Sequence, residues 1–84
     1  MKHVKIYTTP WCVFCRRAKK LFDDKAVEFE EINVSGKLDL RAEMEKLSGG
    51  RSVPQIFIDG KPIGGCKELQ ALEEEGKLDE LLEN

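Results

Sequence analysis

Two cysteines separated by two residues, Cys12 and Cys15, are the side chains of this 84-residue chain best suited to chemistry. They lie where a short apolar run gives way to a helical pattern, so we expect them at the start of a helix. Unpaired N–H groups and the helix dipole stabilise an anion there, which favours a thiolate. A disulfide between residues so close would remove little entropy from the unfolded chain. The pair therefore predicts a disulfide that is made and broken in redox chemistry.

The two sulfurs are expected to differ in role. Helical periodicity places Cys15 at the margin of the apolar stripe and turns Cys12 toward the side that carries Arg16 and Lys19. Residues three apart on a helix have Cβ atoms about 5 to 6 Å apart, close enough for a disulfide with little backbone movement. We therefore expect Cys12 to be the exposed, attacking sulfur and Cys15 to be sheltered behind it.

A zinc site is the alternative interpretation of the cysteine pair. Zinc normally takes four ligands, and the chain offers only Cys66 and His3 besides the pair, neither at the spacing of a zinc finger. A Cys-x-x-Cys pair on a strand-to-helix turn within a βαβ unit is typical of redox proteins. The sequence therefore favours redox chemistry over a metal site.

Hydropathy patterns predict the elements that hold the pair. An apolar run at residues 4–7 predicts a buried strand, and a stripe at helical spacing predicts an amphipathic helix from residue 13 to about residue 25. Residues 27–34 alternate between apolar and polar types with one slip in phase, which predicts a second strand with a bend or bulge. A strand, a helix and a strand in this order predict a right-handed βαβ unit.

The second half of the chain predicts a hairpin between two helices. A narrow apolar face predicts a surface helix from about residue 40, ended by Gly49-Gly50. Asp59-Gly60 is typical of a two-residue hairpin turn, and Pro62 indicates that the last strand is an edge strand. Leucines after Gly64-Gly65 predict a final helix in two parts. We expect one α/β domain over residues 1–84, with the order β-α-β-α-β-β-α(α).

Composition excludes several classes of function. Charged residues make up 36% of the chain, apolar residues 40%, and the net charge is −2, which is typical of a soluble globular protein. Basic and acidic residues alternate, which argues against a nucleic-acid partner. No stretch approaches the roughly 20 apolar residues of a membrane span, and residues 1–7 lack an apolar signal segment. We expect a cytoplasmic monomer with no membrane partner.

These motifs, in this order, resemble those of the dithiol glutaredoxins of small bacterial type. The resemblance runs from Val4 to about Leu82, and it implies a thioredoxin-like fold with a central mixed four-stranded sheet flanked by helices. It also implies a thiol-disulfide oxidoreductase that reduces protein disulfides and glutathione mixed disulfides, with glutathione as reducing co-substrate and no metal. The motifs that carry it are Ile6-Tyr7-Thr8, Cys12-x-x-Cys15, Ser-Val-Pro-Gln-Ile-Phe-Ile-Asp-Gly at residues 52–60, and Ile63-Gly64-Gly65-Cys66.

The resemblance implies a role for each matching residue. Cys12 would be the nucleophile that takes up a glutathionyl group, and Cys15 would resolve intramolecular disulfides. Pro54 would be a cis-proline, and the backbone of Val53 would pair with the peptide part of glutathione. The helix opened by Gly65 would bind the γ-glutamyl carboxylate through its N–H groups. The expected glutathione-binding residues are Thr9, Phe14, Ser52, Val53, Pro54, Gly65, Cys66, Lys67 and Glu68.

Four positions depart from the family pattern. Thr9 replaces a lysine often found near the glycyl carboxylate, and Val13-Phe14 replaces the usual Pro-Tyr. Lys67 replaces an acidic residue that binds the glutathione ammonium, so that contact falls to Glu68 or to water.

Two further residues keep alternative interpretations. Trp11, unusual in this family, is either a platform for a protein substrate or a shield for the disulfide. Cys66 is either a small buried residue at a tight turn or a site of glutathionylation.

Two other functions compete with this interpretation. One is a redoxin recharged by thioredoxin reductase that donates electrons to ribonucleotide reductase; such proteins resemble the first half of the chain but lack the motifs of residues 52–66. The other is an iron–sulfur cluster carrier, in which the first cysteine and glutathione bridge a cluster between two protomers. A resolving Cys15 favours disulfide formation over cluster ligation. The partners implied are glutathione and disulfide-containing or glutathionylated proteins, ribonucleotide reductase among them.

Overall fold

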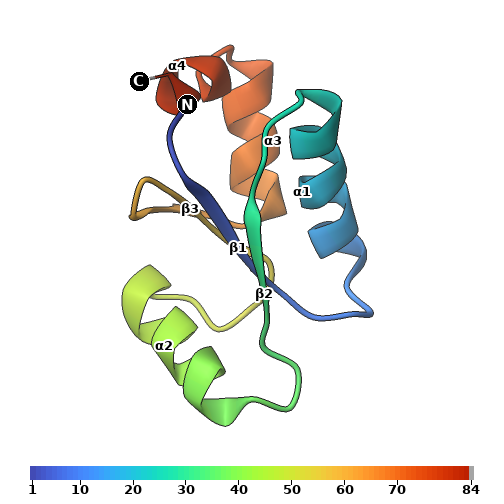
Figure 1. Cartoon of the computed structure of the whole chain (residues 1–84), viewed down its shortest axis with the longest axis vertical. Helices are drawn as coiled ribbons and strands as arrows, with labels where there is room; N and C mark the ends of the chain where they lie inside the picture. Colours follow the sequence, from blue (N-terminus) through green and yellow to red (C-terminus); the bar gives the residue numbers. More distant parts are fainter. Residues whose placement is uncertain (84) are drawn as a thin grey trace.

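The computed structural model describes residues 1–83, and within them it contains four strands and four helices (Figure 1). Their order is the predicted one. In sequence they are β1 (Val4–Thr8), α1 (Val13–Asp24), β2 (Glu30–Asn33), α2 (Leu38–Ser48), β3 (Gln55–Ile58), β4 (Lys61–Gly64), α3 (Cys66–Glu74) and α4 (Leu78–Leu82).

The strands form one mixed sheet in the order β2-β1-β3-β4. β1 pairs parallel with β2 and antiparallel with β3, and β3 pairs antiparallel with β4. Asp59 and Gly60 both have positive φ angles, 53° and 83°, as the predicted type I′ turn requires. The predicted mixed four-stranded sheet is confirmed, and Pro62 lies on an edge strand. The chain therefore passes directly from the central strand β1 to the cysteine pair.

The sheet separates two apolar cores because side chains alternate along its strands. In β1, Val4 and Ile6 pack on one face, whereas Tyr7 packs on the other. Helices α1 and α3 run side by side, and α2 lies apart from them (Figure 1). The larger core contains Val4, Ile6, Ala18, Phe22, Val27, Ile56, Ile58, Leu69, Leu78 and Leu82; the smaller contains Tyr7, Val34, Met44 and Phe57.

The second strand is shorter than predicted. Only Glu30–Asn33 of the expected residues 27–34 pairs with β1. Before it, the Val27 N–H donates to the Phe22 carbonyl at 2.9 Å, which folds the chain back against α1. The Val27 side chain is buried there, and the ring centroids of Phe29 and Phe22 are 6.1 Å apart. Residues 27 and 29 are thus apolar because they cover α1, which explains the slip in phase.

Helix α2 lies on the surface, as predicted. Met44 is its buried residue, whereas Leu38 and Leu47 are exposed. The helix ends at Gly49, whose φ of 79° lies in the left-handed region that glycine adopts readily. Across residues 1–83, no helix has the length and apolarity that crossing a bilayer demands.

Candidate active site

Cys12 caps the N-terminus of α1. Its backbone is extended, and its Sγ accepts a hydrogen bond from the Cys15 N–H at 3.0 Å. On the other side, the Cys12 thiol donates to the Val53 carbonyl at 3.7 Å. Cys12 is partly exposed, as predicted. The reason differs from the predicted one, because Cys12 is the N-cap that precedes the helix and does not lie on one of its faces. The sulfur is thus held between the helix start and the loop that precedes β3.

The electrostatic surroundings of Cys12 favour a negative sulfur. The first turn of α1 contains no acidic residue, so nothing in that turn offsets the positive end of the helix dipole. The Cys15 N–H that reaches Cys12 Sγ is one of the groups that have no partner within the helix. A thiolate here is both a nucleophile and, once part of a disulfide, a good leaving group.

Cys15 lies behind Cys12 and is only 1% exposed, which confirms the predicted shelter. Burial, followed by the hydrogen bond and the charge of Cys12, raises the pKa of Cys15 to about 12. The Thr9 backbone and the Lys19 ammonium act in the opposite direction. Cys15 therefore keeps its proton at pH values well above its ordinary pKa.

A buttress of three polar side chains joins the elements under the cysteine loop. Glu31 Oε2 accepts from Lys19 Nζ at 2.9 Å and from Thr8 Oγ1 at 2.8 Å. The Lys19 hydrogen bond, and then that of Thr8, lowers the pKa of Glu31 below its ordinary range. This buttress ties the end of β1 to β2 and α1. Sequence reasoning missed it because only the βαβ fold brings these residues together.

A groove of about 520 Å³ opens beside the cysteines. All the expected glutathione-binding residues except Thr9 line it, and they come from α1, the loop before β3 and the start of α3. Gln70 also lines it and was missed, although it follows Lys67 by three residues on α3. Thr9 instead lies against Cys15. The lining is Phe14, Ser52, Val53, Pro54, Gly65, Cys66, Lys67, Glu68 and Gln70.

Glycines allow the groove wall to close tightly. The Val53–Pro54 peptide bond is cis, as predicted, and a Cβ on Gly65 would lie 3.3 Å from the Pro54 carbonyl oxygen. Gly64 has a φ of +114°, and a Cβ there would lie 2.8 Å from the Glu68 side chain. A larger residue at Gly65 would press against the Pro54 carbonyl, and a larger residue at Gly64 would displace the Glu68 side chain.

The Glu68 carboxylate already accepts a hydrogen bond from one of the backbone N–H groups that were expected to bind a ligand carboxylate. Gly65 N–H donates to Glu68 Oε1 at 2.7 Å. The N–H groups of Cys66 and Lys67 follow in the first turn of α3, where no intrahelical acceptor is available. The groove thus offers these two amides and the Lys67 side chain to an anionic group.

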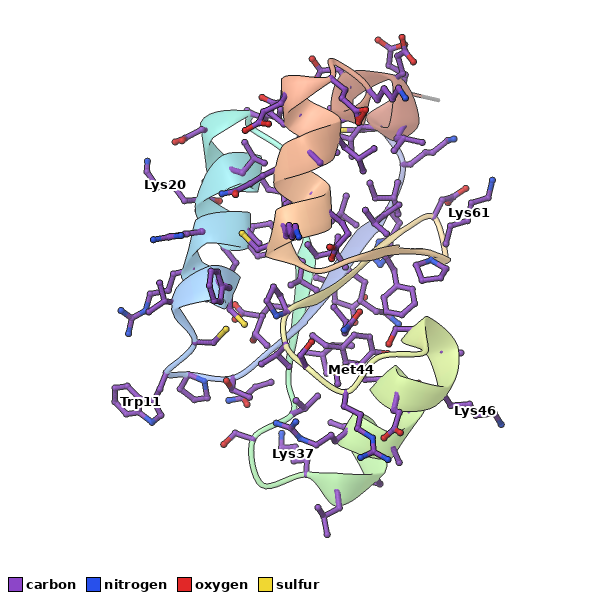
Figure 2. The ribbon with its side chains drawn as sticks, turned by 180° about the vertical axis from the view of Figure 1, so that it is seen from behind. Trp11, Lys20, Lys37, Met44, Lys46 and Lys61 are labelled. Carbon is purple, nitrogen blue, oxygen red and sulfur yellow. The ribbon has the colours of Figure 1, made fainter. Side chains whose placement is uncertain are left out.

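Two residues had alternative interpretations. Cys66 is 4% exposed, and burial raises the pKa of its thiol, which fits a small buried residue better than a reactive one. Trp11 is 87% exposed, and Figure 2 shows its ring projecting away from the ribbon. A side chain so placed covers little of the buried Cys15.

Comparison with known proteins identifies the family. The model of the glutaredoxin family matches residues 4–63, well over half of the chain. This chain is a glutaredoxin. As a glutaredoxin, it is a glutathione-dependent thiol-disulfide oxidoreductase, and neither the redoxin nor the cluster-carrier alternative is favoured.

Relatives and solved structures agree with this assignment. The chain is 52% identical over 82 residues to a glutaredoxin of Pseudomonas aeruginosa, covering 98% of each chain. It is 50% identical to glutaredoxin 3 of Escherichia coli, covering 98% of this chain and 99% of that one. The solution structure of a Brucella melitensis glutaredoxin has a TM-score of 0.86 at 54% identity, covering 98% and 89%. The thioredoxin-like fold is therefore confirmed.

Proposed function

We propose that this glutaredoxin reduces glutathione mixed disulfides through Cys12 alone and protein disulfides through Cys12 and Cys15 together. The observation that supports this most directly is the Cys12 sulfur at the N-terminus of α1, bonded to the Cys15 N–H and adjoining the groove. We propose in addition that residues 1–84 act as one domain, a monomer in the cytoplasm, on glutathionylated and disulfide-containing proteins, including ribonucleotide reductase.

The glutathione mixed-disulfide reaction needs one cysteine of the protein. The Cys12 thiolate attacks the glutathione sulfur of the substrate, so that a new S–S bond forms and the substrate leaves as a thiolate that takes up a proton. A second glutathione thiolate then attacks the glutathionyl sulfur. Cys12 leaves as a thiolate and oxidised glutathione is released. The oxidised glutathione combines the glutathionyl group of the substrate with one free glutathione, so the reaction consumes one free glutathione and returns the substrate cysteine as a thiol.

Reduction of a protein disulfide adds Cys15. Cys12 first forms a mixed disulfide with one substrate sulfur and releases the other as a thiol. Cys12 then carries neither the charge nor the hydrogen bond that help to raise the pKa of Cys15, so Cys15 loses its proton more readily. Its thiolate attacks Cys12 and frees the second substrate thiol. Two glutathiones reduce the resulting Cys12–Cys15 disulfide, and the order of the steps follows from the coupling between the two sulfurs.

The groove is the proposed glutathione site. A buckwheat glutaredoxin was solved as a complex with glutathione; it has a TM-score of 0.88 to this chain at 32% identity, covering 96% of this chain and 76% of that one. By analogy, the Val53 backbone pairs with the peptide and the first N–H groups of α3 bind the γ-glutamyl carboxylate. The Phe14 ring covers the ligand. Lys67 adds a positive charge at that carboxylate.

Single-cysteine variants test the assignment. Cys15→Ser is expected to keep turnover of glutathionylated substrates, measured with glutathione, glutathione reductase and NADPH, but to lose reduction of an intramolecular disulfide. Cys12→Ser is expected to abolish both activities. An active Cys12→Ser variant, or wild-type turnover with thioredoxin reductase but not with glutathione, would contradict the proposal.

A further inference from the structure

We propose that a second surface, formed by exposed residues that flank Cys12 and do not line the groove, binds acidic polypeptide segments that flank the reacting cysteine of a protein substrate. This surface, the rim, consists of Trp11, Val13 and Arg16. The proposal rests on the proposed function and deepens it, because it names the class of protein substrate that Cys12 receives.

The rim presents apolar side chains that the fold does not use. Trp11 is 87% exposed and Val13 is 54% exposed, and they stand on either side of Cys12 in the sequence. Neither belongs to the two cores or lines the groove. Trp11 projects from the end of the molecule where the β1–α1 loop turns (Figure 2). Exposed aromatic side chains of this kind act as anchors at protein interfaces.

The rim is also positively charged. Arg16 is exposed and makes no ion pair with any residue in the range 1–83, whereas Lys19 and Lys20 on the same helix pair with Glu31 and Asp24. Arg17, next to Arg16, places its guanidinium 5.5 Å from the centroid of the Phe14 ring at the groove. Because the first turn of α1 contains no acidic residue, the helix dipole adds to this charge.

Seven of the sixteen acidic residues lie at the other end of α1 or on and between the last two helices. They are Asp23, Asp24, Glu73, Glu74, Glu75, Asp79 and Glu80. In Figure 1, α1 runs from the cysteine loop toward the end of the molecule that carries α4. The rim itself contains Arg16 and no acidic residue, so its charge is positive beside the reacting sulfur. A positive charge there favours the approach of acidic partners.

The geometry of the reaction selects a polypeptide as the occupant. In a glutathionylated protein, the glutathione half lies in the groove while Cys12 attacks its sulfur, so the polypeptide half must leave over the side that the groove does not occupy. Trp11 and Val13 offer apolar contact there, and Arg16 offers an ion pair. The complementary segment has one or two carboxylates and an apolar residue next to its cysteine.

Two glutathionylated peptides of equal length test the proposal, one with Asp and Leu beside its cysteine and one with Lys and Leu. The mixed disulfide of cysteine and glutathione, which has no polypeptide, serves as the reference substrate. Wild-type protein is expected to prefer the acidic peptide by about tenfold in kcat/KM at low salt, and less at high salt. Arg16→Glu should remove most of this preference, whereas Lys61→Glu, the matched charge change on β4, should not.

Trp11→Ala is expected to lower kcat/KM for both peptides by about fivefold to tenfold and to leave the reference substrate unchanged. Trp11→Phe should restore most of the loss. Equal slowing of the reference substrate, or no preference between the peptides in wild-type protein, would overturn the proposal. If sedimentation shows dimers that Arg16→Glu dissociates, the occupant is the acidic end of a second copy, which also overturns it. A wild-type protein inactive on the reference substrate would instead refute the proposed function.

Discussion

The state of Cys12 should control the acidity of Cys15, and Cys12→Ser isolates this effect. A serine keeps an oxygen that can accept the Cys15 N–H at the helix cap, but it removes the negative sulfur. The pKa of Cys15 stands at about 12 against an ordinary 9.0, a difference of about 4 kcal/mol between its protonation states. Burial, the largest cause, survives the substitution. The Cys15 pKa should therefore fall from about 12 and still exceed 9.0.

NMR titration of ¹³Cβ-labelled cysteines measures this shift without modifying a thiol, because the Cβ resonance moves when the sulfur ionises. Cys66→Ser in both proteins removes the other buried thiol, and near-identical amide spectra would exclude a change of fold. If the Cys15 midpoint stayed where it is in the parent protein, Cys12 would not contribute to it. The ordering of the two reaction steps derived above would then be wrong.

Three further predictions concern stability, each measured as the free energy of unfolding in urea. Tyr7→Phe should raise it by about 1 kcal/mol, because no hydrogen-bond partner for the buried Tyr7 hydroxyl lies within residues 1–83; a loss instead would indicate an unseen partner. Gly64→Ala should lower the free energy of unfolding by about 1 to 3 kcal/mol, because Gly64 has a φ of +114° and the new Cβ would clash with Glu68. The loss should exceed that of Gly36→Ala, whose Cβ would meet no atom within 4 Å. Reduced protein should lose stability from pH 9 to about pH 12, since unfolded Cys15 ionises in that range and folded Cys15 does not; Cys15→Ser should show a smaller loss.

Local sequence patterns predicted most of the fold. The Asp59-Gly60 turn and the change of period before Cys12 depend on neighbours along the chain, so each could be read without a structure. The length of β2 could not be predicted in this way. Val27 and Phe29 have the apolar character of strand residues, but they pack on α1, and only the tertiary contact with Phe22 distinguishes the two cases.

The groove was predicted through the family resemblance, and its polar details were not. The contact with the ligand ammonium was expected to fall to Glu68 or to water, and the hydrogen bond from the Gly65 N–H to the Glu68 carboxylate was not foreseen. The pairing of Lys19 with Glu31 joins residues on two elements, and its partners become visible only once β2 lies beside β1. The conformation of a turn is determined by residues that are neighbours in the sequence. The partner of a long charged side chain depends on which elements the folded structure brings together.

The position of Cys12 as the N-cap of α1 links redox state to the folding of that helix. A thiolate is a stronger cap than the neutral sulfur of a disulfide, because its charge interacts with the helix dipole. We therefore expect the first turn of α1 to be more stable when a Cys12 thiolate caps it than when Cys12 is part of a disulfide. Since stabilising the reduced form makes a protein a stronger oxidant, the reduction potential depends on how firmly α1 begins. Substitutions that strengthen the thiolate cap should raise the electron affinity of the protein without touching either sulfur.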